Sequence, residues 1–182
     1  LVLDSIGEWN TISIWQGTGG KLKKLWSQNY PHSVGIWYSA MTQRIGLKPQ
    51  EHEYILMGMA AIGDANKYYN LIKSDFIKQM PSLKDPRTVF KRNCHRGCLD
   101  WRTDLNTVQD YADIAAATQR IYEEIFEAYC LITAKKAECK NLVLMGGCAL
   151  NCVANTIAYK YFDSVWIMPN PGDAGSAIGC VL

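Results

Sequence analysis

Long apolar runs are missing from this sequence of 182 residues. None approaches the ~18 consecutive apolar residues that a membrane-spanning helix needs, so we expect no contact with a membrane. A charge of one sign is missing too. The 19 lysines and arginines nearly balance the 17 aspartates and glutamates, and the formal net charge is +2. A dedicated nucleic-acid binder usually carries a larger basic excess. Repeats and low-complexity segments are also absent, and 48% hydrophobic residues suffice for a core.

An initial methionine and a charged-then-apolar leader are not present either, and the chain stops at Leu182 within a helical pattern. The length suits one domain. We therefore expect residues 1–182 to form a single-domain fragment of a longer, cytoplasmic protein, with neither nucleic acid nor membrane as a partner.

Histidine is scarce, with three residues, and the seven cysteines are an odd number, which argues against a disulfide framework. The most metal-like cluster is Cys94-His95-Arg96-Gly97-Cys98, but no second pair of ligands follows at a zinc-site spacing. Structural thiols are the favoured interpretation and a metal site is the minority one. Cys148 and Cys152 are expected to be small buried hydrophobes.

Alternation of apolar and polar residues near the start predicts three strands joined by tight turns, which is typical of an antiparallel meander. They cover 1–4, 9–15 and 21–26, with the first turn at Ser5-Ile6-Gly7. Helical spacing then predicts three short helices, which cover 33–46, 53–61 and 67–80. A strand near 89–90 precedes a long helix, which begins at the capping-box pattern of Thr107 and Asp110.

After the long helix the pattern changes to alternating strands and helices. Continuous apolar runs predict strands buried on both faces at 141–145 and 164–168, and the predicted helices cover 149–161 and 174–179, the last continuing to Leu182. Two parallel crossovers added to an antiparallel meander predict a mixed sheet in an α/β fold. This is the ribonuclease-H-like arrangement, one lobe of the actin-like ATPases, with a helical insertion over about 47–106.

Three glycine-bearing turns each follow an apolar strand. They are Asp4-Ser5-Ile6-Gly7-Glu8, Met145-Gly146-Gly147-Cys148-Ala149-Leu150-Asn151 and Pro171-Gly172-Asp173-Ala174-Gly175. Ligands of open α/β sheets bind at the carboxyl ends of strands, where the predicted topology places all three turns. Backbone amides near Gly7, Gly146, Gly147 and Gly172 could approach a phosphate, and Asp4 could hold a metal. Asp173 on its own is more often a helix cap.

The chain resembles the O-carbamoyltransferase family, which includes the nodulation-factor and aminoglycoside-antibiotic carbamoyltransferases. The resemblance runs in order from end to end of the chain. The segments that carry it are Asp4 to Trp9, Tyr38-Ser39-Ala40-Met41-Thr42, Glu53-Tyr54-Ile55-Leu56-Met57-Gly58-Met59-Ala60, Gly146-Gly147-Cys148-Ala149-Leu150-Asn151-Cys152-Val153-Ala154-Asn155 and Gly172-Asp173-Ala174-Gly175.

The resemblance implies an enzyme that moves a carbamoyl group from carbamoyl-adenylate to an acceptor hydroxyl. Carbamoyl-adenylate is made from carbamoyl phosphate and ATP in a further domain, and this chain would be one lobe of the actin-like transfer domain. The implied metal, an iron ion, would be held by Asp4 and Asp173 together with two histidines of a His-x-x-x-His motif. The implied nucleotide pocket includes Gly146, Gly147, Asn151 and Asn155. No catalytic residue is assigned.

The sequence departs from the family pattern at several places. The His-x-x-x-His motif is absent, so we expect it, with a first lobe and the adenylate-forming domain, outside this chain. Ile55 stands where many relatives carry lysine, and Ser5-Ile6 replaces a commoner Gly-x. Two alternatives stay open: a nucleotide-binding or interaction module of actin-like fold without transferase activity, and an actin-like sugar kinase.

Six tryptophans invite comparison with a sugar-binding platform, but aromatic residues on strands and helices more often belong to a core. Only Trp101, in the polar stretch from Lys84 to Asp104, is predicted to face an acceptor. The basic residues of that stretch are expected to be solvated.

Overall fold

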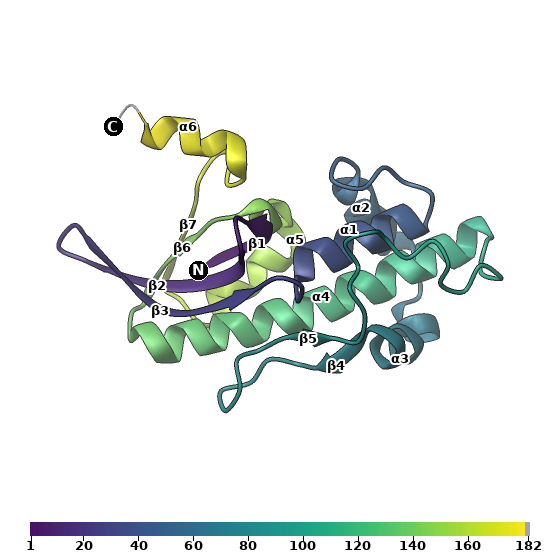
Figure 1. Cartoon of the computed structure of the whole chain (residues 1–182), viewed down its shortest axis with the longest axis horizontal. Coiled ribbons are helices and arrows are strands. Elements are labelled where there is room, and N and C mark those ends of the chain that lie inside the picture. Colours follow the sequence, from purple (N-terminus) through teal and green to yellow (C-terminus); the bar gives the residue numbers. More distant parts are fainter. Residues whose placement is uncertain (181–182) are drawn as a thin grey trace.

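The computed structural model describes residues 1–180, and its first element is the predicted antiparallel meander (Figure 1). It consists of β1 (Val2–Gly7), β2 (Asn10–Thr18) and β3 (Lys21–Asn29), paired in that order. The first turn was predicted at Ser5-Ile6-Gly7, and that position is wrong. Gly7 still pairs with Asn10, so the chain reverses at Glu8, which adopts a φ of 59°. The register between β1 and β2 is interrupted between Leu3 and Gly7, so the backbone at Asp4 leaves the regular ladder.

Helices follow as the spacing predicts, with one correction. The elements are α1 (Val34–Arg44), α2 (Glu53–Met59), the 3₁₀ turn η1 (Ala60–Ile62) and α3 (Ala65–Phe76). The side chain of Ser33 caps α1 by accepting a hydrogen bond from the amide of Ile36. The helix predicted to run to Met80 ends at Phe76 instead. Residues 77–79 form β4 (Ile77–Gln79), which pairs with β5 (Val89–Phe90), so strand pairing overrides the local helical pattern.

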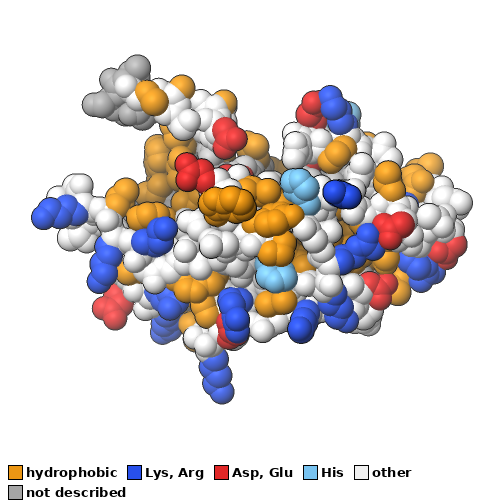
Figure 2. Space-filling view, viewed as in Figure 1, with side chains coloured by type: hydrophobic (Ala, Val, Ile, Leu, Met, Phe, Trp, Pro, Cys, Tyr) orange, Lys and Arg blue, Asp and Glu red, His pale blue; other side chains and the backbone are white. Residues whose placement is uncertain are grey.

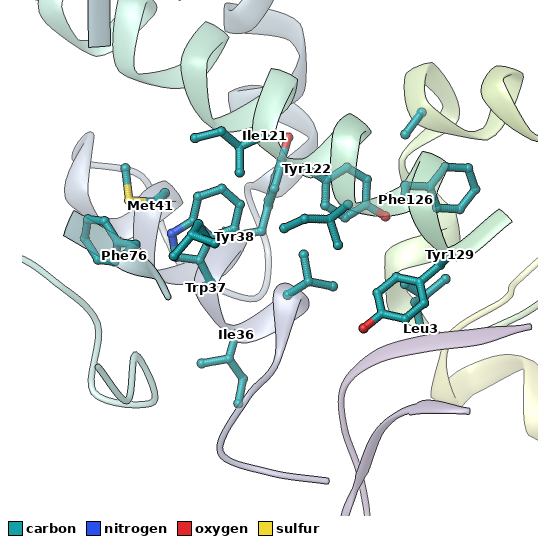
Figure 3. Packing of buried hydrophobic residues seen from close by; sticks show 14 of the residues in the cluster. Leu3, Ile36, Trp37, Tyr38, Met41, Phe76, Ile121, Tyr122, Phe126 and Tyr129 are labelled. Carbon is teal, nitrogen blue, oxygen red and sulfur yellow. The ribbon is translucent and has the colours of Figure 1, made fainter. Parts of the chain in front are cut away.

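The long helix is α4 (Val108–Ala137), and it runs along most of the molecule (Figure 1). Its predicted capping box is confirmed: Thr107 accepts from the amide of Asp110, and the carboxylate of Asp110 accepts from the amide of Thr107. Figure 3 shows Ile121, Tyr122 and Phe126 of α4 beside residues of α1 in the core. Within residues 1–180, no helix is both long and apolar enough to cross a membrane.

The predicted parallel strands are β6 (Asn141–Leu144) and β7 (Ser164–Ile167), which pair in parallel. The amide of Leu3 donates to the carbonyl of Met145 at 3.0 Å, and the amide of Met145 donates to the carbonyl of Leu1 at 3.1 Å. These bonds place β1 beside the end of β6. Meander and parallel pair are thus joined through β1 in a mixed α/β fold.

The expectation that β6 and β7 are buried on both faces is wrong. Leu142 and Leu144 are buried against the core, but Val143 and its cross-strand partner Trp166 are 51% and 53% exposed. One face of the pair packs on the core, and the other is uncovered within the described part of the chain. Apolar runs therefore do not by themselves show that both faces are covered.

The helix predicted over 149–161 is divided into short turns. These are η2 (Gly147–Leu150), α5 (Cys152–Asn155) and η3 (Thr156–Lys160), followed after β7 by η4 (Asp173–Gly175) and α6 (Ser176–Gly179). The break arises because Asn151 accepts a hydrogen bond from the amide of Ala154 and starts a new turn. The predicted continuation over Val181-Leu182 lies outside the described residues. The boundaries of a single unit over 1–182 and an insertion over 47–106 stay predictions.

Candidate functional site

A cleft of about 550 Å³ lies where the carboxyl end of β1 meets α1, α2 and the turns η2 and η4. Its walls combine carboxylates, hydroxyls, amides and aromatic rings. The lining residues are Asp4, Ser5, Ile6, Gly35, Ile36, Tyr38, Ser39, Gln50, Glu51, Glu53, Tyr54, Met57, His95, Tyr122, Gly147, Cys148, Leu150, Asn151 and Asp173. Segments that are far apart in the sequence thus meet at one place.

Asp4 stands on the β1 wall, where two contacts fix it. The amide of Ser5 donates to Oδ1 of Asp4 at 2.7 Å, and the hydroxyl of Ser33 donates to the carbonyl of Asp4 at 3.2 Å. Because Ser33 also caps α1, the same side chain ties the start of α1 to the end of β1. Gly35 permits this approach, since a Cβ atom there would lie 2.9 Å from the amide nitrogen of Ser5.

The two later glycine turns close against Asp4. A Cβ atom on Gly147 would lie 3.3 Å from Oδ1 of Asp4, and one on Gly172 would lie 3.9 Å from Cα of Gly147. The amide of Gly146 donates to the carbonyl of Pro171 at 2.8 Å. The structure therefore brings Asp4, Gly147 and Asp173 to one cleft. Figure 2 shows acidic side chains at the hollow below the C-terminal segment.

Asn151 lies on the cleft wall within a buried hydrogen-bond network. Its Nδ2 donates to Oε1 of Gln119 at 2.9 Å, and the hydroxyl of Tyr38 donates to the same oxygen at 2.7 Å. Burial raises the pKa of Tyr38, so its hydroxyl stays protonated and remains a donor. This network joins α1, α4 and the η2 segment, and it holds the cleft wall in one arrangement.

Four of the predicted nucleotide contacts do not line the cleft. Gly7 ends β1, and Gly146 has a φ of +92° and packs so closely on Leu3 that a Cβ atom would overlap its carbonyl. Gly172 supports Gly147 from behind. Asn155 is buried, and its Nδ2 donates to the carbonyl of Ala149 at 2.7 Å. Their role as nucleotide contacts, like that of Gly147 and Asn151, stays a prediction.

The sequence did not predict that residues of α1 and α2 line the cleft. The hydroxyl of Ser39 donates to Oε1 of Glu53 at 2.5 Å, and the amide of Gln50 donates to the same oxygen at 2.6 Å. Tyr54, which lines the same wall, is 65% exposed. Ser39, Glu53 and Tyr54 all lie in segments that carry the family resemblance, which was the available signal. Ile55, the departure from the family lysine, is half-buried on α2 and does not line the cleft.

The metal expectation rests on Asp4 and Asp173. Both line the cleft, and the hydrogen bonds among residues 1–180 engage Oδ1 of Asp4 but not Oδ2. Across the same residues, no three His, Cys, Asp or Glu side chains lie close enough to hold a metal ion. Two carboxylates with free oxygen atoms fit hard cations, but a complete site would need further ligands.

The cysteine pairs differ from one another. Cys94 and Cys98 are buried, and burial raises the pKa of their thiols to about 11 and about 12. Cys148 is half-buried on the cleft wall, and burial raises its thiol pKa to about 12. Cys152 is exposed, so its predicted burial is wrong. It begins α5 on the outward side of a short turn instead of continuing a packed helix.

The aromatic predictions need correction as well. Trp101, the predicted acceptor-side residue, is only 7% exposed, and its Nε1 donates to Asp75 while its ring packs on Phe76. It belongs to the core. Trp9, Trp15 and Trp166, which the sequence placed in the core, are exposed. The basic residues near Trp101 are mostly at the surface, as expected, where Arg87, Arg92 and Arg102 each pair with an aspartate.

Comparison with known proteins points to one family. The sequence profile described as "Carbamoyltransferase N-terminus" matches residues 1–182. The uncharacterized protein sll1178 of Synechocystis is 36% identical over 204 residues, which cover 100% of this chain and 32% of that protein. Nodulation protein NolO of Bradyrhizobium diazoefficiens is 27% identical over 91% of this chain and 31% of its own length.

A short local match has a higher percentage identity. Nodulation protein U of Sinorhizobium fredii is 50% identical over 42 residues, which are 22% of this chain and 8% of that protein. This chain spans about a third of the length of sll1178 and NolO. The match over the whole chain, together with the segments that meet at the cleft, shows that the chain belongs to the carbamoyltransferase N-terminus family.

Proposed function

We propose that this chain is one lobe of the actin-like transfer domain of an O-carbamoyltransferase. In the proposed reaction, an acceptor hydroxyl attacks the carbamoyl carbon of carbamoyl-adenylate, which another part of the longer protein makes from carbamoyl phosphate and ATP. A new C–O bond forms, the bond from the carbamoyl carbon to the phosphate oxygen breaks, and AMP leaves as the hydroxyl gives up its proton.

The observation that supports the proposal is the convergence of the family segments on one cleft. Asp4, Ser39, Glu53, Gly147 and Asp173 come from different parts of the chain and line the same space. The stability of the fold alone would not require polar residues from all these segments to line the same cleft. Catalytic groups of α/β proteins gather in this way at strand ends.

The proposed roles follow from the contacts. Gly147 has no side chain between its backbone and Asp4, so a phosphate could approach the amides that begin η2. Tyr38, Gln119 and Asn151 would keep that wall rigid through their hydrogen bonds. Rigid positioning of a donor and an acceptor is one of the main sources of rate enhancement in group transfer.

Asp4 and Asp173 are the proposed ligands of a divalent metal, expected to be iron, and two histidines would come from outside this chain. When bound, the ion would act as a Lewis acid and template for the phosphoryl and carbamoyl oxygens. Within this chain, Ser5 and Ser33 would hold Asp4 in place for that purpose.

The test uses the longer protein with carbamoyl phosphate, ATP and metal, and it follows AMP formation and carbamoylation of the acceptor. Asp4→Asn and Asp173→Asn are expected to lower transfer at least ~100-fold, because each removes a charge from the reacting site. Asp163→Asn, which changes an exposed aspartate outside the cleft, should leave it unchanged. The proposal fails if the longer protein forms no AMP, and a module without transferase activity would then be the better account.

A further inference from the structure

A second hollow, of about 290 Å³, adjoins the cleft and has no part in the proposed reaction. We refer to it as the side chamber. It lies between α1 and the turn of residues 94–97, and Ser5, Ser39, Gln50 and His95 line both spaces. A ligand in the cleft could therefore extend a group into the side chamber without crossing a wall.

The two spaces differ in charge. Four carboxylates line the cleft, those of Asp4, Glu51, Glu53 and Asp173, and neither lysine nor arginine is among its described lining residues. The side chamber has the opposite character within the described chain, since Arg96 and His95 line it and carboxylates do not. Like charges in a confined space repel, so an anionic group that no bound cation screens is disfavoured beside the carboxylates and favoured beside Arg96.

The turn that carries Arg96 is fixed to α1. Cys98 contacts the carbonyl of Ala40 through its Sγ atom at 3.3 Å. Gly97 adopts a φ of +81° and packs against Gln43 so closely that a Cβ atom would overlap its Oε1. The positive φ favours glycine at this position, and the contacts with Ala40 and Gln43 hold the turn against α1.

Further contacts brace the turn from outside. Arg92 and Asp100 form an ion pair of 2.7 Å across its two ends. The ring of His95 meets the ring of Tyr30 edge-on, with 5.8 Å between their centres. Asn93 adds a hydrogen bond from its Nδ2 to the Tyr30 hydroxyl. These contacts hold the backbone of the turn, and with it the Cα atoms of His95 and Arg96, beside the side chamber.

The polar ends of these two side chains are not used by the rest of the described chain. Arg87, Arg92 and Arg102, from the same irregular segment, are each paired with an aspartate. Within residues 1–180, the Arg96 guanidinium forms no ion pair and the His95 ring donates no hydrogen bond. A rigid turn that presents an unpaired guanidinium at the edge of a ligand-sized hollow is suited to binding an anion.

We propose that the side chamber is a subsite for a phosphoryl or carboxylate group, with Arg96 as its charged donor and His95 as a second donor. The rest of the ligand would lie in the carboxylate-lined cleft. The ligand's identity rests on the proposed function: the anionic group would belong either to the carbamoyl donor or to the acceptor. The presence of the subsite does not depend on that choice.

Titration of this chain with inorganic phosphate, followed by calorimetry, tests the subsite directly. Arg96→Gln is expected to weaken phosphate binding at least ~10-fold, the usual effect of losing a charge-assisted hydrogen bond to an anion. Lys84→Gln makes the same change of charge at an exposed residue outside both hollows and should bind phosphate as the unaltered chain does. Arg96→Lys keeps the charge but loses the planar guanidinium, so its affinity for phosphate should lie between those of Arg96→Gln and Lys84→Gln.

The proposal is overturned if the unaltered chain binds no phosphate, or if Arg96→Gln binds it as well as Lys84→Gln does. A melting curve of each variant shows whether it is folded, and Arg96 is exposed, so its replacement should leave the fold intact. Weaker phosphate binding by Arg96→Gln supports the subsite even when the longer protein proves inactive, which separates this test from that of the proposed function.

Kinetics of the longer protein distinguish the two sources of the anion. If the group belongs to the carbamoyl donor, Arg96→Gln lowers the amount of acceptor carbamoylated per AMP formed, because carbamoyl-adenylate is made elsewhere in the longer protein, and it leaves the KM for the acceptor unchanged. If the group belongs to the acceptor, Arg96→Gln raises the KM for the acceptor and leaves carbamoylation per AMP unchanged at saturating acceptor. Either pattern supports the subsite, and a variant in which both values are unchanged contradicts it.

Discussion

Gly35, in the first turn of α1, sets how closely that helix approaches the end of β1. A Cβ atom there would lie 2.9 Å from both the amide nitrogen and the hydroxyl of Ser5, closer than side-chain carbons pack in proteins. Because Ser5 also holds Asp4, crowding at Gly35 would be felt at the cleft wall. This residue links the local geometry of a helix to the position of a candidate metal ligand.

We predict that Gly35→Ala lowers the free energy of unfolding by about 1–3 kcal/mol, the usual cost of overpacking a close contact. Gly58→Ala is the matched control. Gly58 lies within α2 with open space around its Cα, so alanine should be neutral or raise stability by up to ~1 kcal/mol through helix propensity. Urea unfolding of both variants measures the difference, and equal stability would show that Ser5 moves away at no cost.

The cysteines give a second prediction for single residues. Burial raises the thiol pKa of Cys98, Cys130 and Cys148 to about 12, from an ordinary value near 9, so almost no thiolate forms at these positions at neutral pH. Cys139 and Cys152 are exposed. Since the thiolate is the reactive form, we expect a disulfide reagent at pH 8 to modify Cys139 and Cys152 and to spare the three cysteines of raised pKa until the chain unfolds.

Mass spectrometry of peptides from the labelled chain checks this order of reactivity.

The raised pKa values also have a consequence for stability. A thiol whose folded pKa exceeds its unfolded pKa contributes stability that is present below about pH 9 and is lost as the pH rises toward about 12. Rapid labelling of Cys98 in the folded chain at pH 8 would contradict both statements.

At the scale of elements, the start of α4 shows which features could be predicted from local sequence. Thr107 and Asp110 form the reciprocal cap that the spacing indicates, because both partners lie within one turn. The ends of α3 and of the helix after β6 could not be predicted in the same way. The pairing of β4 with β5 joins residues that are distant in sequence, and helical periodicity does not contain it. The cap at Asn151 is local, but it lies inside a continuous helical pattern that hides it.

We predict that Thr107→Ala lowers the free energy of unfolding by about 1 kcal/mol, the typical value for a lost N-cap. Thr103→Ala, in the exposed segment just before the cap, should have little effect. The hydrogen bond from Thr107 is the largest cause that holds the pKa of Asp110 well below its usual range. The contribution of Asp110 to stability is therefore present above about pH 4 and declines as the pH falls.

Urea unfolding followed by circular dichroism at pH 7 and pH 3 measures the loss of stability in Thr107→Ala and its dependence on pH. The difference in stability between Thr107→Ala and the unaltered chain should be smaller at pH 3, where Asp110 is largely protonated in the unfolded chain but still ionised in the folded one. A cap mutant as stable as Thr103→Ala at pH 7 would show that tertiary packing of α4 alone determines where the helix begins.

At the scale of the whole molecule, one face of the β6 and β7 pair is apolar and uncovered. The alternation of polar and apolar residues along the strands does not explain this. Val143 and Trp166 are side by side on it, and β7 is an edge of its two-stranded sheet. Exposed apolar residues on a strand edge promote pairing with another chain. We predict that Trp166→Lys reduces self-association of this chain at high concentration, whereas Trp9→Lys, at an exposed tight turn, does not.

Analytical ultracentrifugation over a range of concentrations measures this difference. If the two variants sediment alike, and both as the unaltered chain does, the β6 and β7 face does not drive association. If Trp9→Lys alone reduces association, the contact lies at the turn between β1 and β2. Trp9, Trp15 and Trp166 are all exposed, whereas aromatic residues on strands are expected in a core.

The cleft as a whole presents two of the expected metal ligands. We therefore predict that this chain alone binds Fe²⁺ or Mn²⁺ weakly, since Asp4 and Asp173 supply two carboxylates and residues 1–180 contain no cluster of three candidate ligands. Calorimetric titration with each ion tests this. Micromolar or tighter binding that Asp4→Ala abolishes would show that the remaining ligands lie within the chain.

Local sequence was enough to locate most strands and helices, because hydrophobic periodicity and capping operate over a few residues. It was also enough to select Asp4 and Gly147, which follow apolar strands, whereas Asp173 was selected as a metal ligand only through the family resemblance. The tertiary structure alone decided that Glu53 and Ser39 face the same cleft, that Trp101 is core and that Trp166 is exposed. The physical reason is that burial depends on which distant segments cover a residue, and its own neighbours along the chain do not record that.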